Sequence, residues 1–64
     1  MKRAKLLRYL AQHGCELLRD GEKHSIHINI ANRQTAPIPR HVDIASRLAL
    51  LICKELGIEP LSER

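Results

Sequence analysis

Aromatic side chains are almost absent from this sequence of 64 residues, which holds one tyrosine and neither tryptophan nor phenylalanine. A core built from this chain must therefore be aliphatic and thin. Because a domain of this length is near the lower limit for a self-sufficient hydrophobic core, contact with a partner chain would add to its stability. The same scarcity argues against binding of single-stranded nucleic acid by stacking of bases on aromatic rings.

Cysteine is also scarce, since Cys15 and Cys53 are the only two and lack the close spacing of a zinc motif. We expect two free thiols, buried as small hydrophobic side chains, in a protein of the reducing cytoplasm. The histidines add possible ligands, but no helical His-x-x-x-His pair and no glycine-rich phosphate loop occur. The sequence therefore predicts neither a metal site nor a cofactor.

Long hydrophobic runs are missing as well. In the N-terminal segment "MKRAKLLRYLAQHG" the apolar residues are interleaved with Lys, Arg and Gln. This interleaving is unlike a signal peptide or a membrane span, so we expect a soluble, cytoplasmic protein without a membrane partner. Basic residues outnumber acidic ones by 11 to 7, for a formal charge of +4. Such a charge favours polyanionic partners without specifying nucleic acid.

Helices are expected near both ends of the chain. The first covers residues 2–13 and ends at Gly14, and the second follows Asp43 as its N-cap and ends at Gly57. Apolar residues at helical spacing predict the buried faces. They are Ala4, Leu6, Leu7, Leu10 and Ala11 in the first helix, and Ile44, Leu48, Leu51, Ile52 and Leu56 in the second.

Three short strands are expected between the helices, in "CELLR", "KHSIHINI" and "TAPI". The Asp20-Gly21 pair suits a tight turn between the first two strands, and Pro37 predicts that the third strand lies at an edge or is irregular. In the second strand the isoleucines alternate with polar residues. We expect Ile26, Ile28 and Ile30 to pack on the helices with His24 half shielded at the rim of the core, and Ser25, His27 and Asn29 to face solvent.

These elements predict one domain over residues 1–64 with the order α-β-β-β-α. Its fold class is α+β, with a three-stranded antiparallel sheet and both helices on one face of it.

Histidines among basic residues are the arrangement in this sequence that points to catalysis. Cleavage of RNA without a metal needs a base for the 2′-OH proton and an acid for the departing 5′-oxygen. Histidine suits both tasks, because its unperturbed pKa of about 6.5 leaves both forms populated near neutrality. The phosphates would be bound by Lys23, Arg33, Arg40, and by Lys5 and Arg8 on the first helix.

Each histidine also has a simpler interpretation. His13 fits the end of a helix, His27 a solvated strand position and His41 a loop that precedes the second helix. The alternation of the strand makes His24 as consistent with a structural role as with a catalytic one.

In order and spacing, several segments resemble the HicA toxins of bacterial toxin–antitoxin pairs. They are "HGCELLRDGEKHSIHIN", "TAPIPRH" and the helix end "KELGI", and with the first helix they cover nearly the whole chain. Gly21 and His24 match a glycine turn followed by histidine, and Ile38-Pro39-Arg40-His41 matches a Val-Pro-x-His-like segment. The resemblance implies a fold similar to double-stranded-RNA-binding domains, and a metal-independent ribonuclease that cleaves mRNA with His24 as its catalytic residue.

The resemblance also implies a partner, a HicB-like antitoxin that covers the active site. The toxin alone would be a monomer, and it would form a hetero-oligomer with the antitoxin. The second acid–base group is open between Lys23, His27 and His41. Two alternatives are a non-catalytic RNA-binding module of the same fold, and a degenerate toxin that only binds its partner. The second alternative is suggested by Glu22-Lys23, which stand where the family carries Gly-Ser.

Overall fold

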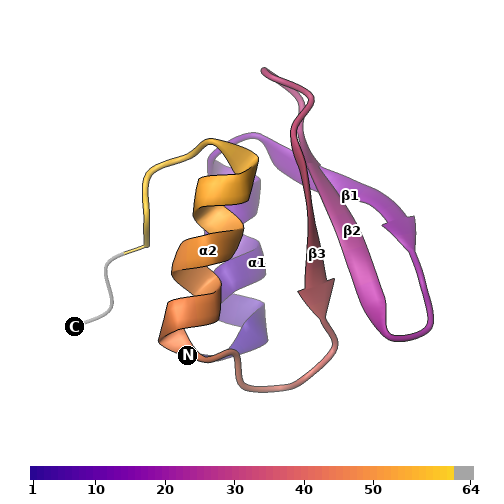
Figure 1. Cartoon of the computed structure of the whole chain (residues 1–64), viewed down its shortest axis with the longest axis vertical. Helices are drawn as coiled ribbons and strands as arrows, with labels where there is room; N and C mark the ends of the chain where they lie inside the picture. The colour runs from indigo at the N-terminus through magenta and orange to yellow at the C-terminus, as the bar shows by residue number, and fades with distance from the viewer. Residues whose placement is uncertain (62–64) are drawn as a thin grey trace.

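The computed structural model describes residues 1–61 and shows the predicted element order. The elements are α1 (Arg3–Gln12), β1 (Cys15–Asp20), β2 (His24–Asn29), β3 (Thr35–Pro39) and α2 (Ser46–Leu56). The strands form one antiparallel sheet in the order β1-β2-β3, and both helices lie on the same side of it (Figure 1). The α+β class and the edge position of β3 are confirmed. Residues 62–64 of the predicted domain lie outside the described residues.

The core lies between the sheet and the two helices and is built from aliphatic side chains and two thiols. Cys15 and Cys53 are buried and free, as predicted. Burial raises the pKa of the Cys15 thiol, and the nearby Cys53 raises it further, which lowers its reactivity as a nucleophile. The largest fully buried side chains are Leu6, Leu10, Ile38, Ile44, Ile52, Cys53 and Leu56.

The buried face of α1 is narrower than predicted. Leu6 and Leu10 are fully buried and Leu7 is half-buried, whereas Ala4 and Ala11 are exposed. A helix turns by about 100° per residue, so both alanines lie far around the helix from the Leu6–Leu10 stripe. The helix ends as predicted, with Gly14 in the left-handed region at a φ of 78°.

The face of β2 that packs on the helices is the one that was predicted to face solvent. Ser25, His27 and Asn29 are buried beneath the helices, while Ile26 and Ile28 lie half-buried on the open face of the sheet. His24 is exposed rather than half shielded, and Ile30 lies exposed beyond the strand. The prediction that the isoleucines fill the core is therefore wrong.

Hydrogen bonds to the ends of the two helices explain why the polar side chains of β2 can face the helices. Arg3 of α1 donates from Nη2 to the Ser25 hydroxyl at 3.0 Å. At the other end of the strand, the Asn29 amide donates from Nδ2 to the Leu56 carbonyl of α2 at 2.8 Å. Buried polar groups cost little free energy once they are hydrogen-bonded, so these contacts make the polar face of β2 compatible with burial.

α2 begins later than predicted. Its N-cap is Ala45, and Asp43 instead bridges to Lys2, with Lys2 Nζ 3.4 Å from Asp43 Oδ1. Leu51, predicted to be buried, is 50% exposed. The predicted end of the helix is confirmed, because Gly57 adopts a left-handed φ of 72°.

Candidate functional site

A hollow of about 350 Å³ lies where β2 begins and β3 ends. The antiparallel pairing of His24 with Pro39 brings these two strand ends together. Both His24 and His41 are exposed there. The side chains that line the hollow are Lys23, His24, Pro39, Arg40 and His41.

The segment that carries His41 is held by the N-terminal residues. The backbone N–H of Arg3 donates to the Val42 carbonyl at 2.7 Å, and the N–H of Ile44 donates to the Met1 carbonyl at 2.7 Å. These bonds fasten the chain on the α2 side of His41. The other side of His41 is fastened by β3, so the histidine stands in a short span between two fixed points.

The loop between β1 and β2 places Lys23 and His24. It comprises residues 21–23, because Asp20 is still the last residue of β1. The backbone N–H of Gly21 closes the loop by donating to the His24 carbonyl at 2.9 Å. The turn thus falls where the Asp-Gly pair predicted it, with Lys23 directly before the strand.

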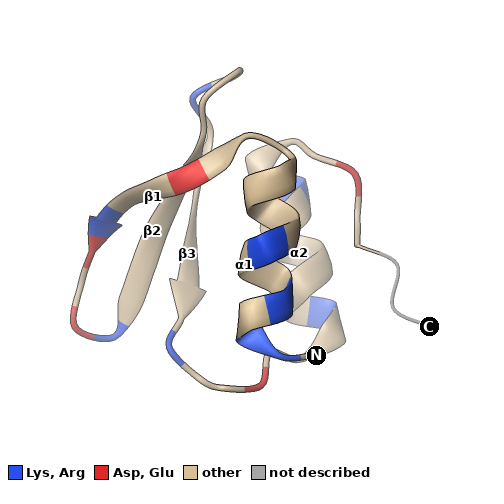
Figure 2. Cartoon of the chain, turned by 180° about the vertical axis from the view of Figure 1, so that it is seen from behind, with Lys and Arg blue, Asp and Glu red and all other residues tan. Residues whose placement is uncertain are grey.

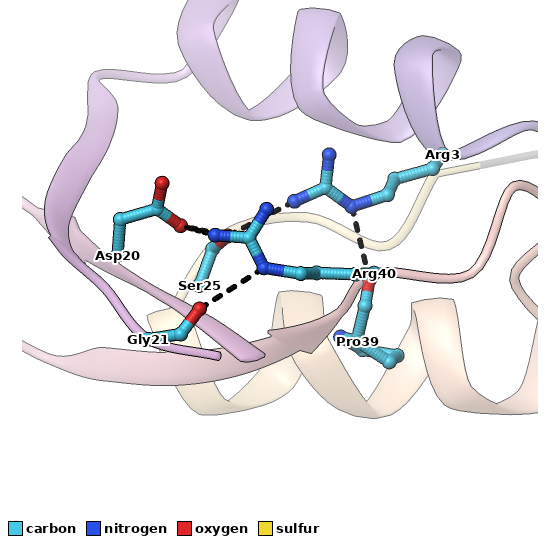
Figure 3. Close-up of polar contacts among 6 residues, drawn as sticks. All are labelled: Arg3, Asp20, Gly21, Ser25, Pro39 and Arg40. Carbon is cyan, nitrogen blue, oxygen red and sulfur yellow. Dashed lines mark hydrogen bonds and ion pairs between the residues drawn. The ribbon is translucent and has the colours of Figure 1, made fainter. Parts of the chain in front are cut away.

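A chain of side-chain contacts links α1 to the mouth of this loop (Figure 3). Arg3 donates from Nε to the Pro39 carbonyl at 2.9 Å and from Nη2 to the Ser25 hydroxyl at 3.0 Å. The Ser25 hydroxyl in turn donates to Asp20 Oδ1 at 3.1 Å. The guanidinium of Arg3 therefore ties the start of β2 to the end of β3.

Arg40, which directly follows β3, completes the chain. Its Nη2 forms an ion pair with Asp20 Oδ1, and its Nε donates to the Gly21 carbonyl at 3.0 Å (Figure 3). The two side chains of the pair are 42% and 54% exposed. Ion pairs at this exposure stabilise a fold by only about 0–1 kcal/mol, so the main consequence of this one is the orientation of Arg40.

The residues predicted to bind RNA divide into three locations. Lys23 and Arg40 lie with His24 in the hollow. Lys5 and Arg8 line a separate hollow of about 220 Å³ on α1, together with Tyr9, Gln12 and Leu61. Arg33 lies in the turn between β2 and β3, at the end of the sheet away from the loop of residues 21–23 (Figure 1). Basic positions accordingly run along α1 and mark both ends of the sheet (Figure 2).

The other two histidines lie outside the hollow. His13 is exposed at the end of α1, with Nδ1 2.9 Å from the Tyr9 carbonyl, in keeping with its predicted place at a helix end. His27, predicted to be solvated, is only 8% exposed, and among residues 1–61 its Nδ1 is a buried atom without a hydrogen-bond partner. Burial lowers the pKa of His27 and the Arg3 charge lowers it further, against an opposing backbone hydrogen bond with Ser25.

Of the candidates for a second acid–base group, Lys23 and His41 line the hollow with His24. His27 lies on the opposite face of β2, beneath the helices. Within residues 1–61, no group of three or more His, Cys, Asp or Glu side chains is placed to hold a metal ion. In the same range, neither helix is long and apolar enough to cross a membrane.

Comparison with protein-family models, with curated proteins and with solved structures found no match in any of the three. The similarity to double-stranded-RNA-binding domains therefore stays a prediction.

Sequence reasoning missed the roles of Arg3, Asp20 and Ser25. Asp20 and Ser25 are ordinary residues for their positions, an acid before a turn glycine and a polar residue in an alternating strand, whereas Arg3 is a basic residue at the start of the apolar stripe of Leu6 and Leu10. The contacts among them join segments that are distant along the chain, and no local pattern reports such pairing. Two signals were usable: a basic residue, Arg3, at helical spacing from Leu6 and Leu10, and the excess of polar residues in β2, which need partners wherever they are buried.

Proposed function

We propose that this protein is a HicA-like toxin, a metal-independent endoribonuclease that cleaves mRNA by histidine acid–base catalysis. The observation that carries the proposal is the hollow in which two exposed histidines, His24 and His41, stand with Lys23 and Arg40. Two imidazoles can divide the roles of base and acid, and two cations can hold the phosphate between them.

In this mechanism one histidine removes the proton of the 2′-OH, whose oxygen then attacks the adjacent phosphorus. The bond from phosphorus to the 5′-oxygen breaks, and the second histidine donates a proton to that leaving oxygen. The products are a 2′,3′-cyclic phosphate and a free 5′-hydroxyl. We assign the two proton-transfer roles to His24 and His41, which both line the hollow. Lys23, which lines it too, is assigned to the phosphate, and His27 lies buried on the other face of β2.

The test is induced expression of the wild type and of His24→Ala and His41→Ala, with growth and RNA integrity followed over time. Loss of one acid–base group typically slows a reaction by about 10²–10⁴-fold, so we expect both variants to lose growth arrest and RNA cleavage in EDTA. Circular dichroism should show that the fold is retained, because both side chains are exposed.

His13→Ala is the matched control, since His13 is an exposed histidine outside the hollow. We expect it to cleave RNA like the wild type. A His24→Ala variant that remains fully toxic would show that the catalytic assignment is wrong.

A non-catalytic RNA-binding module is the second candidate. It is favoured by Lys5 and Arg8, which form a basic surface on α1 away from both histidines of the hollow. This function predicts salt-sensitive RNA binding without cleavage. Cleaved RNA ends that depend on His24 would rule it out.

A HicB-like antitoxin is the partner that we propose for this toxin. Large apolar side chains on the surface of so small a domain support a protein partner, because they remain in contact with water otherwise. Those with the greatest exposure are Leu17, Leu18, Ile30, Val42, Leu50 and Leu51.

A further inference from the structure

We propose that Arg40 binds an RNA phosphate through one edge of its guanidinium, and that Asp20 is the positioning residue that presents this edge. The ligand class, a phosphodiester, rests on the proposed ribonuclease function. The orientation of Arg40 rests on the contacts of the structure alone.

The contacts of Arg40 divide its guanidinium into a used and an unused edge. Nε and Nη2 form the side-on edge of the group, and both donate to the protein, Nε to the Gly21 carbonyl and Nη2 to Asp20 (Figure 3). The end-on edge, formed by Nη1 and the second N–H of Nη2, has no partner among residues 1–61. Two parallel N–H groups in one plane match two oxygens of a phosphate.

Asp20 can orient Arg40 because Asp20 is itself held. It pairs with Ser25 across β1 and β2, and its Oδ1 accepts from the Ser25 hydroxyl at 3.1 Å. The Ser25 hydroxyl accepts in turn from Arg3 Nη2. Arg3 Nε donates to the carbonyl of Pro39, the residue before Arg40, at 2.9 Å. Arg40 is thus connected to Arg3 of α1 in two ways, through Asp20 and Ser25 and through the backbone of Pro39.

A fixed guanidinium binds more tightly than a free one, since less side-chain freedom is lost on binding. Arg40 lines the same hollow as His24 and His41, so a phosphate that Arg40 binds in this hollow would share it with both imidazoles. Asp20 also reduces the net positive charge beside the hollow. Its positioning and its charge therefore act on RNA affinity in opposite directions.

A pair of variants separates these two effects. Asp20→Asn and Asp20→Ala remove the same charge, but only asparagine keeps an oxygen that can accept from Arg40 and Ser25. The measurement is the Kd for an RNA oligonucleotide methylated at every 2′-oxygen, followed by fluorescence anisotropy at one salt concentration. Methylation removes the attacking hydroxyl, so binding is observed without cleavage.

We expect the alanine variant to bind about three- to tenfold more weakly than the asparagine variant, a loss of the size of one net hydrogen bond. In an Arg40→Ala background the two Asp20 variants should bind equally, because no guanidinium is left to orient. Equal affinity with Arg40 present would overturn the proposal, as would a difference that survives Arg40→Ala.

The comparison requires that Asp20→Ala is folded at the assay temperature, which thermal melting measures. If that variant melts below the assay temperature, Arg40→Lys replaces it, since lysine keeps the charge without the planar edge. About three- to tenfold weaker binding of Arg40→Lys supports the proposal, and wild-type affinity overturns it. Neither result depends on catalysis, so a fully active His24→Ala would defeat the proposed function while leaving this test intact.

Discussion

His27 is the residue whose placement departs furthest from its expected chemistry. Its ring lies beneath the helices, and within residues 1–61 Nδ1 is buried without a hydrogen-bond partner. Burial and the charge of Arg3 both disfavour the protonated ring, so the pKa of His27 is lowered from its ordinary value. The folded protein therefore binds this proton less readily than the unfolded chain does.

The lowered pKa of His27 predicts a loss of stability in acid. Above about pH 6.5 the ring is neutral in both states, and as the pH falls below this value the unfolded state takes up the proton first. The free energy of unfolding should then fall by up to about 1.4 kcal/mol per pH unit until the folded-state pKa is reached. His27→Leu should remove this contribution, which urea denaturation at pH 7.5 and pH 5.5 would measure.

The exposed His13 provides the control, because His13→Leu should keep the acid sensitivity of the wild type. If His27→Leu loses as much stability between the two pH values as the wild type does, His27 is not the source of the effect.

At the scale of the element, β2 shows that a strand can bury its polar face. Its partners are the ends of the helices, Arg3 of α1 for Ser25 and the Leu56 carbonyl of α2 for Asn29. The isoleucines are left half-buried on the open face of the sheet. That open face is a second apolar surface, outside the core that holds the domain together.

Two isoleucine variants test this orientation. Ile38 of β3 is fully buried on the helix side, so Ile38→Ala should lower the free energy of unfolding by about 2–5 kcal/mol. Ile26 is half-buried on the open side, so Ile26→Ala should cost only about 1 kcal/mol. Urea denaturation of both variants gives the comparison. A larger loss for Ile26→Ala than for Ile38→Ala would mean that the isoleucine face packs on the helices after all.

At the scale of the whole molecule, the basic residues form separate surfaces rather than one continuous patch. Lys23 and Arg40 border the hollow of the histidines, and Lys5 and Arg8 border another on α1. The molecule measures only 28 Å by 27 Å by 16 Å. An RNA of a dozen nucleotides is therefore long enough to span the molecule, and we expect a trinucleotide to occupy one surface at a time.

RNA length should separate the two surfaces. For a 2′-O-methylated trinucleotide, Lys23→Gln with Arg40→Gln should weaken binding, and Lys5→Gln with Arg8→Gln should not. For a dodecamer, either double variant should reduce the dependence of log Kd on log salt by about 1.4, the sum for two contacts to a single strand. Titrations at several salt concentrations measure these slopes. An unchanged slope for the Lys5 and Arg8 variant with the dodecamer would mean that the RNA does not contact these two residues of α1.

Much of the fold could be predicted because its signals are local. Leucine spacing identified α1, the glycines at 14 and 57 marked both helix ends, and Pro37 limited β3 to an edge or an irregular strand, of which the structure shows the edge. The N-cap of α2 was missed because Asp43 found a competing partner in Lys2, which lies far away in the sequence. Local preference gave way to tertiary contact at that position.

The candidate site was only partly predictable for the same reason. His24 and the basic residues could be named from the sequence, since residue type and turn chemistry are written in it. That His41 and Arg40 share a hollow with His24 depends on the pairing of β2 with β3. The contact of Arg40 with Asp20 depends further on how the loop of residues 21–23 lies against the end of β3.

The sequence by itself determined which segments are helix and which are strand, because periodicity and turn residues act over a few positions. Only the tertiary structure decided which face of β2 is buried. Alternation divides a strand into two faces, but the choice between them depends on whether distant groups can satisfy the polar side chains. Here Arg3 and the Leu56 carbonyl do so, and His24 consequently stands in the open beside His41 and Arg40.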